Sequence, residues 1–249
     1  PRTEIIELHA RPDVIVTKGR TRDAVHLPQE QRDKLIRRHA GTATEAQELD
    51  GELLKDIEGT LWKRLVLDRT RVGAAPPLVR IVIAIDPAAK DGDESDEMGI
   101  IVAGLGQAYI PDRNGFVRQH AYVLDDLSGR MPPEECMRKA AEAYHAWKAD
   151  VVIAETNNGG DWIGTTLRQI DRTVNYDTVT ATRGKATRAE PVAAVFSQNA
   201  AHIVNSLPDL ETQLTTWVPG QDSPDRLDAM VWALTSLMLA DAGNSAAVA

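Results

Sequence analysis

Two short apolar runs, at residues 81–85 and 151–154, restrict the fold of this chain more than any other feature of its sequence. Both consist of Val, Ile and Ala alone, as expected for central strands that are buried on both faces of a sheet. Each run is followed at once by an acidic residue, Asp86 after the first and Glu155 after the second. The sequence therefore predicts an α/β fold in which two carboxylates leave the ends of buried strands.

The order of the remaining patterns defines the expected sheet. Further strands are expected at residues 99–104, 116–124, 177–181 and 202–204. One helix is expected to begin near Pro132, and other helices are expected over residues 161–170, 189–197 and 224–240. The first three strands can pair as an antiparallel meander, whereas the later strands enter through helices and should be parallel. This mixed sheet flanked by helices has the strand order of the RNase H-like fold.

The chain upstream of this pattern has a different character. Residues 1–25 are polar and irregular, and two helices are expected at residues 29–38 and 45–57. Glycines and an Ala-Pro run then interrupt the chain up to Leu78. We therefore expect a partly helical linker region over residues 1–78, an RNase H-like domain over 79–241 and a flexible tail over 242–249.

Charge and composition narrow the classes of function. Taken alone, the net charge of −9 argues against a nucleic-acid partner. Net charge does not describe the charge of a single groove, however, and a metal site needs a local cluster of carboxylates. Cys136 is the single cysteine, so we expect a buried thiol and a reducing compartment. No apolar run approaches the roughly 18 residues of a membrane span, and no signal peptide is recognisable.

Four carboxylates are expected to meet at one edge of the sheet. If the strands before Asp86 and Glu155 are neighbours in one sheet, both carboxylates leave the same edge. Asp225 and Asp228 lie in the first turn of the last expected helix, where Ser223 is the expected N-cap and Pro224 the first helical residue. Hard divalent cations such as Mg²⁺ prefer oxygen ligands. Hydrolysis of a phosphodiester gains from two such ions about 4 Å apart, so the cluster suits a metal-dependent nuclease.

Each carboxylate also has a structural interpretation. An acidic residue after a strand is often a turn residue or a helix cap, and Asp225 alone would favour the helix dipole. The acidic residues of the following loop are interpreted as solvated, although one of them could reach a metal ion; they are Asp91, Asp93, Glu94, Asp96 and Glu97. The ordered set of strand-end Asp, strand-end Glu and first-turn helix Asp favours the functional interpretation.

Several segments resemble the C-terminal nuclease domain of phage terminase large subunits, a family that includes proteins of gene transfer agents. The resemblance rests on residues 85–87, 154–155, 183–191 and 223–229, and upstream on residues 41–42, 47–52 and 58–62, which resemble the stretch between that family's ATPase and nuclease domains. It implies that Asp86, Glu155 and Asp228 are catalytic metal ligands, that Asp225 is an auxiliary ligand, and that Arg183, Lys185 and Arg188 face DNA.

The same resemblance implies an endonuclease that cuts concatemeric double-stranded viral DNA during genome packaging, with two Mg²⁺ or Mn²⁺ ions as cofactors, in the host cytoplasm. The implied partners are the portal protein, the small terminase subunit and the protein's own ATPase domain. These 249 residues contain no G-x-x-x-x-G-K-[ST] pattern, so this stretch is expected not to hydrolyse ATP.

Two other functions remain open from the sequence. One is a non-catalytic module that docks a portal or partner subunit on an RNase H-like scaffold, although a pure scaffold has no need for converging carboxylates. The other is a nuclease that resembles Holliday-junction resolvases. Residues 184–191 favour the terminase interpretation over the resolvase.

Overall fold

The computed structural model describes residues 11–15, 17, 19–39, 49, 57–87, 97–156, 162–181 and 184–239. The chain divides into two compact units, Pro1–Thr60 and Leu61–Ala249. The first contains a short 3-10 helix, η1 (Thr21–Asp23), and α2 (Gln29–His39), which confirms the helix predicted at residues 29–38. The helix predicted at 45–57 lies, apart from residues 49 and 57, outside the described residues, as does the tail at 242–249.

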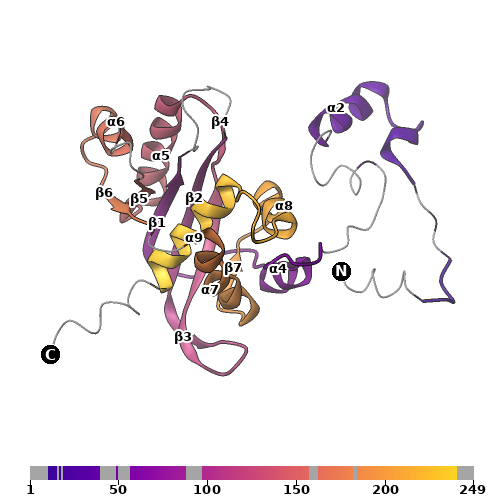
Figure 1. Cartoon of the computed structure of the whole chain (residues 1–249). Helices are drawn as coiled ribbons and strands as arrows, with labels where there is room; N and C mark the ends of the chain where they lie inside the picture. Colours follow the sequence, from indigo (N-terminus) through magenta and orange to yellow (C-terminus); the bar gives the residue numbers. More distant parts are fainter. Residues whose placement is uncertain are drawn as a thin grey trace. The chain divides into compact units, whose positions relative to one another are not determined.

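Within the described residues, seven strands of the second unit form one sheet (Figure 1). They are β1 (Leu78–Asp86), β2 (Glu97–Pro111), β3 (Val117–Asp126), β4 (Gly129–Arg130), β5 (Val151–Glu155), β6 (Tyr176–Val179) and β7 (Ala201–Ile203). The order is β6-β5-β1-β2-β3-β7, and β4 pairs with the start of β2. β1, β2 and β3 are antiparallel, whereas β5, β6 and β7 join as parallel strands. The predicted RNase H-like mixed sheet is confirmed.

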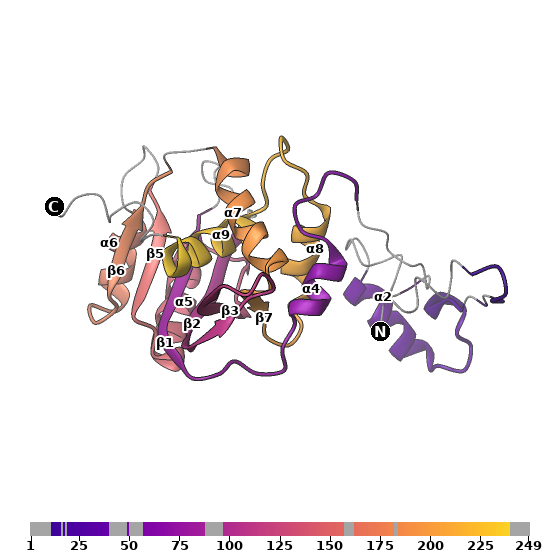
Figure 2. The same cartoon turned by 90° about the horizontal axis from the view of Figure 1, so that it is seen from below.

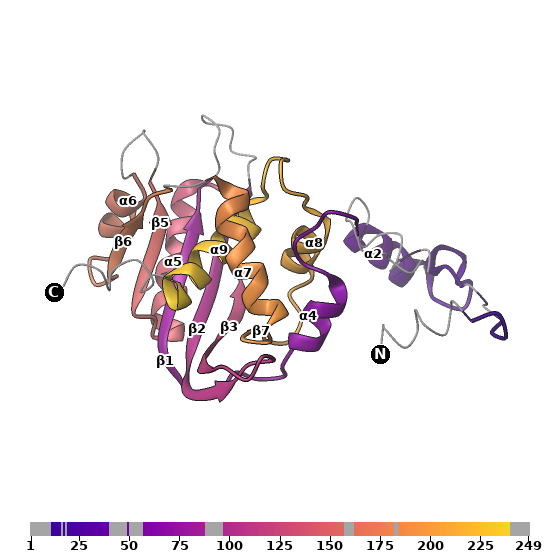
Figure 3. The same ribbon diagram turned by 60° about the horizontal axis from the view of Figure 1, so that its bottom comes forward.

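Helices cover both faces of this sheet, as Figures 2 and 3 show. They are α4 (Arg64–Thr70), α5 (Pro133–Trp147), α6 (Trp162–Ile170), α7 (Lys185–Ser197), α8 (Pro208–Thr216) and α9 (Asp225–Met238). Along β1, Val82 and Ala84 join the core beneath α7, α8 and α9, whereas Ile83 and Ile85 join the core beneath α5 and α6. Burial on both faces explains why the run contains no polar residue.

Some boundaries differ from those expected. β2 continues to Pro111 because its pairing with β3 extends to a tight turn that begins at Asp112. α8 and β4 were not predicted. Residues 61–78, assigned from the sequence to the linker region, lie in the compact unit of the sheet, where α4 packs beside β7 and Val72 forms a bridge with Val204. No helix among the described residues is long and apolar enough to span a membrane.

Cys136 lies on the buried face of α5, as predicted. Burial raises the pKa of its thiol to about 12, so the thiolate that a nucleophile would require is scarce at neutral pH. Cys136 is therefore a core residue of this domain.

A buried histidine pair joins α4 to the edge of the sheet. Nδ1 of His202 donates to the carbonyl oxygen of Thr70 at 2.9 Å, so Nε2 of His202 accepts from Nδ1 of His120, also at 2.9 Å. The two rings stack, and Tyr122 stacks on His202. Burial is the largest cause that lowers the pKa of both histidines, so both stay neutral in the fold.

We expect this pair to make the fold sensitive to mild acid. Unfolded histidine takes up a proton near its ordinary pKa of 6.5, whereas folded His120 and His202 do so only at lower pH. The unfolded state then binds more protons, and the free energy of unfolding falls as pH drops below 6.5. The slope is at most about 1.4 kcal/mol per pH unit for each histidine. Urea denaturation at pH 7.5 and 5.5 measures it. His202→Gln should reduce the loss, whereas the exposed control His26→Gln should not; equal losses in both variants would contradict this account.

Candidate active site

The parallel pairing of β1 with β5 brings two acidic residues together. Ile85 lies opposite Ala154 in this pairing, so Asp86 and Glu155 leave adjacent strands at the same edge. Both residues are more than nine-tenths buried. The strand-end carboxylates that the sequence singled out, 69 positions apart in the chain, are therefore neighbours in the fold.

The first turn of α9 reaches the same edge because a glycine lies beneath it. Gly99 of β2 pairs with Asp86 of β1. A Cβ atom at Gly99 would lie 2.1 Å from the carbonyl oxygen of Asp225, which no side chain could tolerate. The missing side chain lets the backbone of α9 approach the sheet closely, and this places Asp225 and Asp228 beside Asp86.

Asp228 is the most enclosed of the four carboxylates, with 2% of its surface exposed. The hydroxyl of Ser223 donates to its Oδ2, and the ammonium of Lys185 lies 2.6 Å from the same oxygen. The expectation that Ser223 caps the helix is wrong: Pro224 occupies the N-cap position in an extended conformation, without a side-chain cap. Ser223 instead contacts Asp228.

Burial and the charges of this cluster both act on Asp86. Burial raises the pKa of Asp86 well above its ordinary value, and the negative charges of Asp228, Asp225 and Glu155 raise it further. Lys185 is the cation that opposes them. The four carboxylates therefore share one electrostatic field, in which an ionised Asp86 is costly unless a cation lies nearby.

Lys185 is the first residue of α7 and contributes its ammonium to the cluster. A cation is unfavourable at a helix N-terminus, and burial also opposes it. The hydrogen bond to Asp228 and the charges of Asp228, Asp86 and Glu155 outweigh burial and raise the pKa of Lys185. About half of the side chain, 48%, is exposed. Lys185, expected to face DNA, thus also contacts a carboxylate.

Glu155 is held by two donors from different helices. Oε2 accepts from the indole Nε1 of Trp232 at 2.9 Å and from a guanidinium nitrogen of Arg188 at 3.3 Å. The side chain of Arg188 is only 10% exposed, so it faces Glu155 rather than open solvent. Arg183, the third residue expected to face DNA, lies outside the described residues.

Comparison with known proteins identifies the family of this chain. A family profile described as a terminase RNase H-like domain matches residues 83–237, a range that contains Asp86, Glu155, Asp225 and Asp228. The chain belongs to this family. No curated protein matches it significantly.

Solved structures of large terminases share the fold of this terminase domain. A large terminase from a thermophilic bacteriophage, in complex with ADP, superposes with a TM-score of 0.52 at 14% identity, over 87% of this chain and 54% of that protein. A mutant gp2c of the large terminase subunit from bacteriophage Sf6, with calcium, superposes with a TM-score of 0.51 at 12% identity, over 70% and 98%. This chain therefore spans about half of the ADP-bound terminase.

Arg226 fixes the start of α9 in the terminase domain and was not predicted. It lies between Asp225 and Asp228, is buried, and pairs with Asp126 of β3 at 3.0 Å and with Glu97 of β2. Gln213 of α8 links the same region, since it donates to Glu97 and accepts from the backbone of α9. The interpretation of Glu97 as a solvated loop residue is therefore wrong; the other acidic residues of that loop lie outside the described residues.

The donor chemistry of the cluster fits a hard divalent cation, although its present geometry is not a finished metal site. Among the described residues, no three acidic, histidine or cysteine side chains form a ready ligand set. Carboxylate oxygens are the ligands that a hard divalent cation prefers. The positive charge of the Lys185 ammonium lowers the pKa of Asp86, as the charge of a bound cation would.

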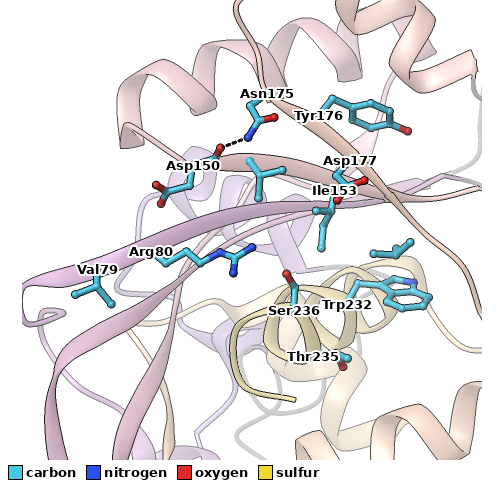
Figure 4. A pocket seen from close by; sticks show the side chains of 12 residues that line it. Val79, Arg80, Asp150, Ile153, Asn175, Tyr176, Asp177, Trp232, Thr235 and Ser236 are labelled. Atoms are coloured by element: carbon cyan, nitrogen blue, oxygen red, sulfur yellow. Dashed lines mark hydrogen bonds between the residues drawn. The ribbon is translucent and has the colours of Figure 1, made fainter. Parts of the chain in front are cut away.

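A groove of about 750 Å³ lies beside this cluster but does not contain it (Figure 4). Its walls come from β1, β5, β6 and the far half of α9, and they include Arg80, Asp150, Asp177 and Ser236. Trp232 belongs both to the groove and to the cluster, through its hydrogen bond to Glu155. The carboxylates themselves lie at the strand ends.

Proposed function

We propose that this terminase domain is a divalent-metal-dependent endonuclease that cuts double-stranded DNA during viral genome packaging. The observation that supports the proposal most directly is the buried carboxylate of Asp86, whose pKa is raised by burial and by three neighbouring carboxylates. Buried carboxylates that converge repel one another unless a cation lies near them, and such clusters are typical of sites that bind cations. The related Sf6 large terminase structure contains calcium, which supports the use of a divalent cation.

Asp86, Glu155 and Asp228 would hold the metal, with Asp225 as an auxiliary ligand. Two Mg²⁺ or Mn²⁺ ions bound there would supply the Lewis acidity that attack on a phosphodiester requires. The protein's own residues orient the ligands: Ser223 and Lys185 hold Asp228, and the contacts of Glu155 hold the carboxylate on β5.

The proposed DNA contacts differ among the three basic residues. Lys185 keeps about half of its side chain exposed, so it is able to meet a phosphate as the substrate approaches the cluster. Arg188 is nearly buried against Glu155, which favours a structural contribution to the site over a direct DNA contact. Arg183 remains a proposed DNA contact on the family resemblance alone.

The proposal extends to the whole protein. DNA would reach this domain through the packaging motor, with the ATPase domain, the portal protein and the small terminase subunit as partners in the host cytoplasm. The converging carboxylates argue against a purely docking function. Cleavage assays separate cutting of duplex DNA from resolution of four-way junctions.

Metal binding and cleavage test the proposal together. Millimolar Mn²⁺ should raise the melting temperature, because a ligand that binds only the folded state stabilises it by mass action. At 100 times the dissociation constant the gain is about 2.7 kcal/mol. The same protein should cut linear duplex DNA with Mn²⁺ or Mg²⁺ and lose activity with EDTA. A metal-stabilised protein that cuts only four-way junctions would favour a resolvase, and a protein with neither response would refute the proposal.

A further inference from the structure

One carboxylate oxygen of Glu155 accepts hydrogen bonds from side chains of two helices. Trp232, in the second turn of α9, donates its indole N–H to Oε2, and Arg188, in the first turn of α7, donates to the same oxygen. Glu155 and Trp232 are both more than nine-tenths buried. A carboxylate oxygen with two donors cannot turn freely, so the remaining oxygen of Glu155 keeps a fixed direction.

Arg188 and Trp232 also hold each other. The guanidinium carbon lies 4.3 Å from the centre of the Trp232 ring, in a cation–π contact. Among the described residues, the buried Nε of Arg188 has no hydrogen-bond partner. The guanidinium is therefore held by Glu155 and by the indole ring rather than by a wider polar network, and removal of either contact should loosen it.

The position of Trp232 along α9 links this contact to the other carboxylates. Trp232 lies four residues after Asp228, so both side chains project from the same side of the helix. α9 thus carries one proposed metal ligand and the donor that orients another. A tryptophan used only to fill a core would need no acidic partner, since an ordinary carbonyl satisfies an indole N–H.

We propose that Trp232 and Arg188 are positioning residues, which hold one oxygen of Glu155 so that the other is presented to a divalent cation. This inference rests on the proposed function. Outer partners that orient metal ligands typically change metal affinity by about 10–100-fold when they are removed. The pair should therefore act on metal affinity first, and only through it on cleavage.

Trp232→Phe in the full chain is the sharpest test, because phenylalanine keeps an aromatic ring against Arg188 and removes the indole donor; the packing that the smaller ring loses is matched by the control below. The Mn²⁺ concentration for half-maximal thermal stabilisation should rise about 10–100-fold. The Mn²⁺ concentration for half-maximal cleavage should rise in parallel, while the rate at saturating Mn²⁺ stays within about threefold of the parent. Arg188→Lys, which retains one donor, should give a smaller rise than Arg188→Ala.

Trp217→Phe is the matched control. Trp217 is similarly buried, and its indole donates to the backbone carbonyl oxygen of Gln221 at 3.3 Å rather than to a carboxylate. The Trp217→Phe variant should have a lower metal-free melting temperature than the parent but the same response to Mn²⁺. If Trp232→Phe behaves as this control does, the tryptophan only packs and the inference is overturned. A parent protein that shows no Mn²⁺ response would instead overturn the proposed function itself.

Discussion

Replacing Asp86 by Asn should abolish DNA cleavage and, at the same time, stabilise the metal-free protein. Burial and three neighbouring carboxylates raise the pKa of Asp86. A raised pKa means that the contribution of Asp86 to stability is complete below its unfolded value of 3.8 and is lost as pH rises through the folded value. At neutral pH the native carboxyl group therefore costs stability, and a neutral amide of the same shape removes that cost.

The expected gain is about 0.5–2 kcal/mol, which corresponds to about 2–4 °C in melting temperature for each kcal/mol in a protein of this size. Cleavage should fall by at least about 1,000-fold, because a residue that acts with others as one catalytic unit cannot be replaced by them. The response of the melting temperature to Mn²⁺ should shrink as well. Differential scanning fluorimetry with and without Mn²⁺, together with a plasmid-cutting assay, measures all three effects.

Glu142→Gln is the control, since it makes the same chemical change on the exposed face of α5. It should alter neither cleavage nor the response to Mn²⁺. A well-folded Asp86→Asn protein that cuts DNA as the parent does would remove Asp86 from the active site. A metal-free melting temperature of Asp86→Asn below that of the parent would show that the carboxylates do not repel as described.

The fold was predictable because its central strands carry a strong local signal. The apolar runs before Asp86 and Glu155 can be buried only in the middle of a sheet, and the order of strands and helices then fixes which strands are neighbours. α8 also had a signal that went unused, since Pro208 and two acidic residues in its first turn are typical of a helix start. β4, with two residues, is too short for any periodic pattern.

The partners of the carboxylates were less predictable because they depend on contacts between distant segments. A basic loop such as residues 183–188 suggests DNA, and only the fold places Arg188 against Glu155, 33 positions away. Ser223 obeys the local rule for an N-cap, yet its hydroxyl contacts Asp228 instead. Trp232 lay one helical turn beyond a proposed ligand, which was the one sequence signal that could have singled it out.

Gly99→Ala should be among the most damaging single substitutions outside the carboxylates. The added Cβ would lie 2.1 Å from the Asp225 carbonyl oxygen and 3.0 Å from the Cβ of Ala229. Because the first of these is backbone, α9 itself must move away from the sheet. Overpacking of this kind typically costs about 1–3 kcal/mol, occasionally more, so the melting temperature should fall by several degrees.

The same shift should harm the active site more than the fold, because α9 carries Asp225, Asp228 and Trp232. A displacement of about 1 Å in a catalytic group can cost about 100-fold in rate, so cleavage by Gly99→Ala should fall by that order even below its melting temperature. Gly73→Ala is the matched control, since an added Cβ there meets nothing within 4 Å. If Gly99→Ala keeps the melting temperature, Mn²⁺ response and cleavage rate of that control, the close approach of α9 to β2 is not what positions Asp228.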